Sequence, residues 1–383
     1  MSVIESIKKE VFEDRKALHL IPEPGFEEIK TSKYIRDVLS TLGIDYESVG
    51  GTGIVAYIKG TSPTKTIAFR TDMDGLSVTE ESSYKYHSQH KQFMHACGHD
   101  GHMAMMLGLA RLLKNPNVTL LDNVVMIFQP AEEGPGGAEV IVKEGILKKY
   151  GVDEIYGIHV FPEIKQGRIG LKSGPMMAMT GEFDIEVIAK SAHGAMPHIG
   201  TDGIIIASEI VLGLQTIVSR NISPISPAVL TIGRMACGER RNIIAGRAKL
   251  EGTIRAFDKA VYNRVKDRMT QYVEGIAHCH DVTINLSFVD MYPPVINDEI
   301  LFNDFFSHHA DRCDIIEPQM ISEDFSYYQE VIPGLFYFIG TYNEEKSYVY
   351  PLHHSKFNFD DQVLLNGMET YKNILLYRGS IEL

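Results

Sequence analysis

The sequence predicts an α/β fold, in which a domain with a mixed, mostly parallel sheet is interrupted by a smaller, ferredoxin-like α+β domain. In the first half of the chain, short apolar strands alternate with helices, and some of the strands are apolar on both faces, as in a parallel sheet covered by helices. From about Thr180 the strands instead alternate apolar and polar residues, and the element order becomes strand–helix–strand–strand–helix–strand. We therefore expect one domain built from 1–179 and 292–383, with the second domain, 180–291, inserted into it.

Helical and strand patterns follow one another through the first segment. Apolar residues recur at helical spacing from Val3 to Leu18, and the pattern stops where two prolines and a glycine occur in IPEPGFEE. A second helix is expected over 29–42. Two strands around a turn follow, in GTGIVAYIKG and TKTIAFRTDMDG. The remaining elements expected there are a helix after His99, the strand NVVMIFQP, the helix AEVIVKEGILKKY and the strand EIYGIHVFP.

The inserted segment and the last segment have their own elements. Four strands are expected in the insertion: EFDIEVIAK, AVLTIGRM, RAKLEGTIRAF and VTINLSFVD. Helices over 201–219 and 259–278 separate them. The last segment resumes helix and strand, with GLFYFIG as a strand of the first sheet.

Composition restricts the class of function. The 383 residues are 44% hydrophobic, enough for two domains, and the formal net charge of -13 argues against nucleic acid or an anionic membrane as a partner. The N-terminus lacks the uninterrupted apolar stretch of a signal peptide, and no segment approaches the roughly 20 apolar residues of a membrane span. The four cysteines are scattered, which favours free thiols over a disulfide framework. We expect a cytoplasmic protein.

Two segments carry residue types that commonly serve as metal ligands. Cys97 and His99 flank one glycine in MHACGHDGH, and thiolate and imidazole are zinc ligands. Glu132 and Glu133 follow an apolar strand in FQPAEEGPGG, and a cation would compensate the repulsion between two adjacent acids at a strand end. Each segment alone has a simpler interpretation: a buried cysteine beside exposed histidines, and a solvated acidic turn.

Three further segments carry similar residues. They are His159 in YGIHVFP, the adjacent His353 and His354 in YPLHHSKFNF, and Asp72 and Asp74 in RTDMDG. A lone strand histidine is more often a satisfied core residue, and paired aspartates are often a polar turn. Because Cys/His, Glu/Glu, His and Asp/Asp lie at four strand ends of one predicted sheet, we interpret them together as a metal site.

With these residues assembled, the chain resembles the zinc-dependent aminoacylase and carboxypeptidase superfamily of co-catalytic metallopeptidases. It is most similar to the branch that contains hippurate hydrolases, plant auxin-conjugate amidohydrolases and bacterial N-acetyldiaminopimelate deacetylases. The similarity runs through LHLIPEPGFEE, RTDMDGL, MHACGHD, FQPAEEGPGGA, GIHV, SAHGAMPH, RNIIAG, LEGTIR, SEDF and LHHSKF. One departure is Ser355, which stands where proline is common.

The resemblance implies that each subunit binds two divalent metal ions, whether zinc, manganese, cobalt or nickel. The implied ligands are Cys97, His99, Glu133, His159 and His353. Cys97 stands where other branches have a bridging aspartate, and His353 is preferred to His354 because the family ligand directly follows leucine. Asp74 corresponds to the carboxylate that orients the ligands.

The resemblance also implies the catalytic residues. Glu132 would act as general base and then as general acid, and His193 would stabilise the oxyanion. Without the resemblance, a loop residue that caps a strand end would be the preferred interpretation of His193. Asn242 and Arg255 match positions that bind the α-carboxylate of the substrate. A homodimer through the inserted domain, which would also serve as a lid, is implied as well.

The expected substrate is a small N-acyl amino acid. EEGPGGAEVI, RNIIA and LHHxK are most similar to the N-acetyldiaminopimelate deacetylase group, which removes acetate from an N-acetylated diamino diacid in lysine biosynthesis. The alternatives are a broad N-acyl-amino-acid hydrolase of the hippurate type and a dipeptidase, which share the metal chemistry. A non-catalytic binding protein is disfavoured, because the full set of implied ligands and the base are present.

Overall fold

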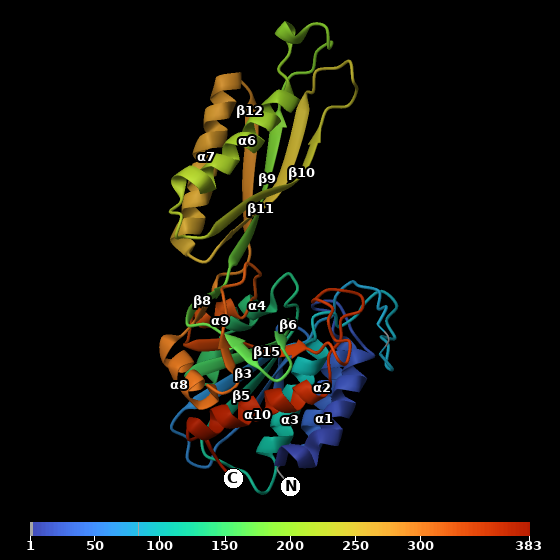
Figure 1. The fold of residues 1–383 in the computed structure, drawn as a ribbon, viewed down its shortest axis with the longest axis vertical. Coiled ribbons are helices and arrows are strands. Elements are labelled where there is room, and N and C mark those ends of the chain that lie inside the picture. Colours follow the sequence, from blue (N-terminus) through green and yellow to red (C-terminus); the bar gives the residue numbers. More distant parts are fainter. Residues whose placement is uncertain (1–2, 83) are drawn as a thin grey trace. The chain divides into compact units, whose positions relative to one another are not determined.

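The computed structural model describes residues 3–82 and 84–383, which divide into two compact units (Figure 1). The first unit comprises Met1–Gly174, Ile296–Glu317 and Asp324–Leu383, and the second comprises Pro175–Val295 and Pro318–Glu323. The chain thus leaves the first unit after residue 174 and returns at 296. That the segment 180–291 is an inserted domain with a lid or dimerisation role stays a prediction.

A mixed eight-stranded sheet forms the centre of the first unit, in the order β1-β2-β5-β3-β6-β15-β7-β14. The strands are β1 (Asp45–Val49), β2 (Gly53–Ile58), β3 (Thr66–Asp72), β5 (Asn123–Gln129), β6 (Glu154–Lys165), β7 (Ile169–Leu171), β14 (Cys313–Ile315) and β15 (Gly334–Tyr342). The four central strands β5, β3, β6 and β15 run parallel, so their carboxyl ends lie at one edge of the sheet. The predicted α/β class with a mostly parallel central sheet is confirmed.

Helices cover this sheet. They are α1 (Val3–His19), α2 (Ile29–Thr41), α3 (His99–Leu113), α4 (Gly137–Lys143), α5 (Ile146–Lys149), α8 (Glu299–His309), α9 (Ser326–Gln329) and α10 (Gln362–Tyr377). The two short strands β4 (Thr119–Leu120) and β16 (Ile381–Glu382) pair with each other.

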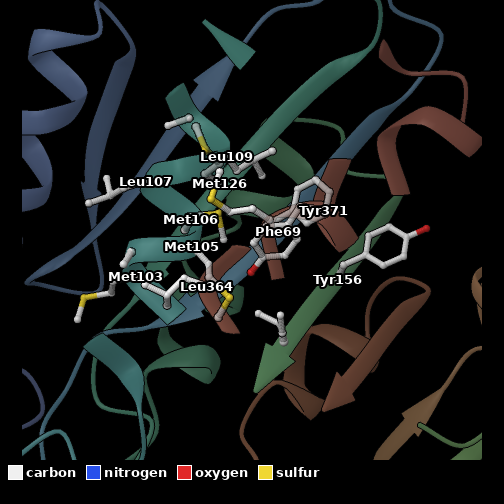
Figure 2. Close-up of a cluster of buried hydrophobic side chains, with 14 of the residues drawn as sticks. Phe69, Met103, Met105, Met106, Leu107, Leu109, Met126, Tyr156, Leu364 and Tyr371 are labelled. Atoms are coloured by element: carbon white, nitrogen blue, oxygen red, sulfur yellow. The ribbon is translucent and has the colours of Figure 1, made fainter. Parts of the chain in front are cut away.

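Helix α3 lies at the centre of the hydrophobic core, with α1 and α10 packed against it. Every residue of α3 except Arg111 is buried, which the run HMAMMLGLA explains, because it has no polar face along most of its length. Figure 2 shows Met105 and Met106 of this helix near Phe69 of β3 and Tyr371 of α10. The rings of Phe69 and Tyr371 meet edge to face at 5.0 Å. This packing fixes the helix whose first residue is His99.

The second unit contains a four-stranded antiparallel sheet in the order β10-β11-β9-β12. Its elements are β9 (Met179–Ile188), a 3-10 turn (Pro197–Ile199), α6 (Gly203–Asn221), β10 (Ala228–Cys237), β11 (Arg247–Ala256), α7 (Lys259–His280) and β12 (Thr283–Asp290). Their chain order is that of a ferredoxin-like unit. The strands β8 (Gly174–Met177) and β13 (Val295–Asn297) lie where the chain passes between the units.

One helix, α6, is long and apolar enough to cross a membrane by length and composition alone. Its residues Ile206, Ile210, Leu214 and Ile217 are buried in the core of the second unit, as expected of a core helix.

The structure differs in three details from the elements predicted by the sequence patterns. β2 and β3 do not form a hairpin, because β5 lies between them and β2 pairs with β1. The single helix expected after the two glutamates is two helices, separated by Gly145 with φ of +76°. His159 lies in the middle of β6 rather than at its end, because the strand continues along β15 to Lys165.

Candidate metal centre

The segment 94–102 makes a sharp turn into helix α3 at the carboxyl edge of the sheet. Gly98 has φ of +87°, a conformation that side chains disfavour, and a Cβ there would lie 2.4 Å from Val160 Cγ2. Only glycine fits this position. The turn places Cys97 and His99, on either side of it, among buried residues.

Three of the predicted ligands converge on Cys97. Its Sγ lies 3.4 Å from Nε2 of His159 and 3.3 Å from Nε2 of His353. The same Nε2 of His353 lies 3.3 Å from Oε1 of Glu133. His354 points elsewhere, since its ring stacks on Tyr350 with centroids 4.7 Å apart. The geometry therefore brings together the residues that the resemblance implies, with His353 rather than His354 facing the thiol.

A second group of donors overlaps the first. Nε2 of His99 lies 3.9 Å from Oε2 of Glu132 and 3.9 Å from Oε1 of Glu133. Glu133 belongs to both groups, one with Cys97 and His353 and the other with His99 and Glu132. Two neighbouring positions for a cation share this carboxylate.

The spacing of the donor atoms suits binding to a metal ion better than hydrogen bonding among themselves. Within residues 3–82 and 84–383, His99 Nε2 and Glu133 Oε1 are buried and have no hydrogen-bond partner. Donors at about 2.0–2.3 Å from a tetrahedral zinc lie roughly 3.3–3.8 Å apart. The contacts among Cys97, His159, His353 and Glu133 fall in this range, and those of His99 to the glutamates, at 3.9 Å, lie just above it. Buried polar atoms are rarely left unpaired, so these atoms are arranged for a ligand.

The protonation state of the centre also indicates a cation. Burial raises the pKa of the Cys97 thiol, and the carboxylates of Glu133 and Glu132 raise it further. Burial would lower the pKa of His99, but Asp72 and Asp74 raise it to about 10. The excess of negative charge thus draws protons into the centre, and a divalent cation is an alternative source of positive charge.

Asp74 holds two of the predicted site residues in place. Its carbonyl oxygen accepts a hydrogen bond from Nδ1 of His99 at 3.0 Å, which leaves Nε2 to face the glutamates. Its Oδ2 accepts a hydrogen bond from the backbone N–H of Glu133 at 3.0 Å. The resemblance implies an orienting role for Asp74, and this role stays a prediction.

A buried network beneath the centre was not anticipated. The backbone N–H of Val160 donates to Nε2 of His102 at 2.9 Å, so Nδ1 of His102 carries the proton that it shares with Asp72 at 2.7 Å. Nδ1 of His159 donates to the Val160 carbonyl at 2.6 Å, which leaves its Nε2 to face Cys97. Arg70 completes the network with a 2.9 Å ion pair to Asp72. His102 stands in the quoted MHACGHDGH motif, three residues after His99, and that spacing on one helix face was the available signal.

The remaining predicted residues lie in the second unit. His193 is exposed, and its Nδ1 accepts a hydrogen bond from Ala195 N–H at 3.1 Å. It neighbours Asn242, whose carbonyl accepts from Gly194 N–H at 2.8 Å. Arg255 lies on β11 and donates to Ser322 Oγ at 3.3 Å.

Within the second unit, Arg255 is far from the other two residues. Arg247, at the start of β11, pairs with Ile188, next to the loop that carries His193, whereas Arg255 pairs with Thr180 at the other end. Eight residues of strand at about 3.4 Å each separate the two ends by roughly 27 Å. The structure does not bring Asn242 and Arg255 together in one chain.

Comparison with known proteins identifies the family. The model of peptidase family M20/M25/M40 matches residues 68–377. The chain belongs to this family. It is 39% identical to N-acetyldiaminopimelate deacetylase of Anoxybacillus flavithermus over 96% of this chain and 97% of that protein. It is also 38% identical to N-acetyl-L-cysteine deacetylase of Bacillus subtilis over 95% of this chain and 87% of that protein. The chain is thus a metal-dependent amidohydrolase.

Solved structures of the family share its fold. An aminohydrolase from methicillin-resistant Staphylococcus aureus superimposes with a TM-score of 0.92 at 34% identity, covering 99% of this chain and 98% of that one. A Bacillus subtilis peptidase of the M20 family, described as binding a dinuclear metal, gives 0.83 at 32% identity over 98% and 99%.

Proposed function

We propose that this chain removes the acetyl group from N-acetyldiaminopimelate, an N-acetylated diamino diacid. The observation that carries the proposal is near-full-length similarity to five enzymes of that name, at 38–41% identity over 89–96% of the chain. The buried donor group described above supports the same chemistry. The product would enter lysine biosynthesis in the cytoplasm.

Five residues would hold two divalent cations: Cys97, His99, Glu133, His159 and His353. Thiolate and imidazole donors favour zinc, although manganese, cobalt and nickel accept the same donors. When bound, the two cations would lower the pKa of a water molecule and polarise the scissile carbonyl.

Glu132 would move the proton. It is buried at 6% exposure, and its Oε2 lies on the Nε2 side of His99. It would take a proton from the attacking water as the water oxygen bonds to the acetyl carbon. It would then pass that proton to the nitrogen as the C–N bond breaks, which yields acetate and the free amine.

Substrate binding would involve two copies of the chain. His193 would stabilise the oxyanion, and Asn242 and Arg255 would bind the α-carboxylate. Because roughly 27 Å of β11 separates Arg255 from the loops of the other two residues, one carboxylate cannot contact both ends within one chain. A homodimer through the second unit would combine Arg255 of one copy with His193 and Asn242 of the other.

The test is acetate release from N-acetyldiaminopimelate by the zinc-loaded protein, beside Glu132→Gln and a control, Glu139→Gln. Glu139 lies on α4 just after the same loop and is partly exposed, paired with Lys143. We expect Glu132→Gln to lose at least about 100-fold in kcat and the control to match the wild type. If the wild type releases no acetate from this compound, the substrate proposal is wrong.

N-acetyl-L-cysteine is a second candidate substrate, because a relative at 38% identity bears that name. Hippurate and dipeptides complete the comparison. The ratio of kcat/KM among the four substrates decides between a dedicated diamino-diacid deacetylase, an N-acetylcysteine deacetylase, a broad acylase and a dipeptidase.

A further inference from the structure

The segment IPEPGFEE, which the sequence identifies only as a break between two helices, packs against the loop that carries the proposed base. This loop, residues 130–136, connects β5 to α4. A Cβ on Gly25 would lie 2.8 Å from Ala131 Cβ and 2.8 Å from the carbonyl oxygen of Gly134. The two backbones are therefore in direct contact.

Glu28, at the end of this segment, is a fully buried carboxylate with two partners. Its Oε1 accepts a hydrogen bond from the backbone N–H of Ala131 at 2.9 Å. Its Oε2 accepts a hydrogen bond from the hydroxyl of Thr52. A carboxylate is costly to bury unless it is hydrogen-bonded, and these two bonds offset that cost.

Ala131 determines the conformation of this loop through its backbone. Its φ of +52° places it in the left-handed region, where a residue with a Cβ is strained. Its carbonyl accepts hydrogen bonds from both Gly136 and Gly137 N–H at 3.1 Å, so it closes the loop. Glu132 is the next residue, and its side-chain direction depends on the backbone angles of Ala131.

We propose that Glu28 is a positioning residue for Glu132, acting through the N–H of Ala131. Its carboxylate holds Ala131 in the left-handed conformation and so aims the Glu132 side chain at the metal centre. The proposal rests on the role proposed above for Glu132, and it adds a residue that lies outside the donor groups of the candidate metal centre.

Two substitutions distinguish the effect of the length of the Glu28 side chain from the effect of its charge. Glu28→Asp keeps the charge but shortens the side chain by one methylene, so it loses the bond to Ala131. Glu28→Gln loses the charge but keeps an oxygen that can accept from Ala131 N–H. We expect kcat of the zinc-loaded protein to fall about 10- to 100-fold in Glu28→Asp and at most threefold in Glu28→Gln, with KM and metal content unchanged in both. If only the charge of Glu28 mattered, kcat would fall more in Glu28→Gln than in Glu28→Asp.

Two controls exclude a general structural effect. Glu27→Asp makes the same change at the adjacent, exposed residue and should match the wild type. Thr52→Val removes the other hydrogen bond of the Glu28 carboxylate, so it should lower the melting temperature yet keep kcat within threefold. If Thr52→Val lowers kcat as much as Glu28→Asp does, Glu28 is merely structural and the proposal is overturned.

Hydrogen exchange supplies a readout that does not depend on turnover. In Glu28→Asp we expect amide exchange in peptides covering 130–137 to accelerate at least tenfold, and in Glu28→Gln to stay as in the wild type. Unchanged exchange in Glu28→Asp would overturn the proposal even if no substrate were cleaved. If Glu132→Gln keeps full activity, the role proposed for Glu132 fails instead, and the exchange result still decides whether Glu28 holds the loop.

Discussion

Replacing His102 with phenylalanine tests whether the network beneath the metal centre controls metal affinity. The ring volume is nearly kept, but Asp72 loses its 2.7 Å partner and Val160 N–H loses its 2.9 Å acceptor. Asp72 keeps its ion pair with Arg70 through Oδ2, but its Oδ1 and the Val160 N–H are left buried without these hydrogen bonds. At about 1–3 kcal/mol for each, the first unit should lose about 2–6 kcal/mol of stability. His159 then loses the fixed backbone that sets its orientation, and zinc affinity should fall about 10- to 100-fold.

The assay is competition for zinc between the protein and a chromophoric chelator, with urea denaturation of the metal-free protein measured beside it. His309→Phe is the matched control. His309 is equally buried but lies on α8, with Nδ1 bonded to the Phe305 carbonyl at 2.9 Å. The control should lose stability yet bind zinc within threefold of the wild type. If His102→Phe binds zinc as tightly as the control does, the network does not act on the ligands.

Three further predictions concern ligands, metal and pH. His353→Ala should weaken metal binding at least tenfold while His354→Ala should not, as measured by metal content after dialysis; equal contents would contradict the assignment. Chelation should lower the melting temperature and added zinc should restore it, since a ligand at 100 times its Kd stabilises the fold by about 2.7 kcal/mol; an unchanged melting temperature in calorimetry would argue against a bound metal. Burial would lower the pKa of His19, but hydrogen bonds to Asp100 and Glu80 raise it to about 9. Because the folded-state pKa is raised, this stabilisation is complete below about pH 6.5 and is lost as the pH rises through about 9. Urea midpoints of the metal-free protein should therefore fall over that range, and less so in His19→Gln.

Periodicity predicted the elements well where the pattern is local. The antiparallel unit gave four strands and two helices in the expected order, because alternation of apolar and polar residues marks each strand of a sheet with one buried face. Strand neighbours were harder to predict. In the sheet, β5 lies between β2 and β3, although residues 73–122 separate β3 from β5 in the chain. Such pairing is decided by crossover connections and helix packing, which no local pattern records.

The sequence proposed ligands for the centre and one supporting residue, Asp74, whereas it did not predict the buried network of His102, Asp72 and Arg70. Cys97, His99 and Glu133 stand in polar motifs that each had a simpler interpretation alone, and the resemblance to a known family implied them as ligands. Arg70 is fully buried inside a strand, and its partner Asp324 is 254 positions away. A charged residue in an apolar strand indicates only that a partner exists, because the partner is chosen by topology rather than by spacing.

The same limit applies to the residues proposed to bind the substrate. Motif similarity assigns Asn242 and Arg255 to one carboxylate, and it carries no information about the distance between them. The register of β11 does carry information about this distance, because Arg255 pairs with Thr180 at one end and Arg247 pairs with Ile188 at the other. A carboxylate is far smaller than the roughly 27 Å between these ends. If both residues bind the substrate, they come from different copies of the chain, so the proposed dimer would be a requirement of the chemistry rather than only a means of stabilising the fold.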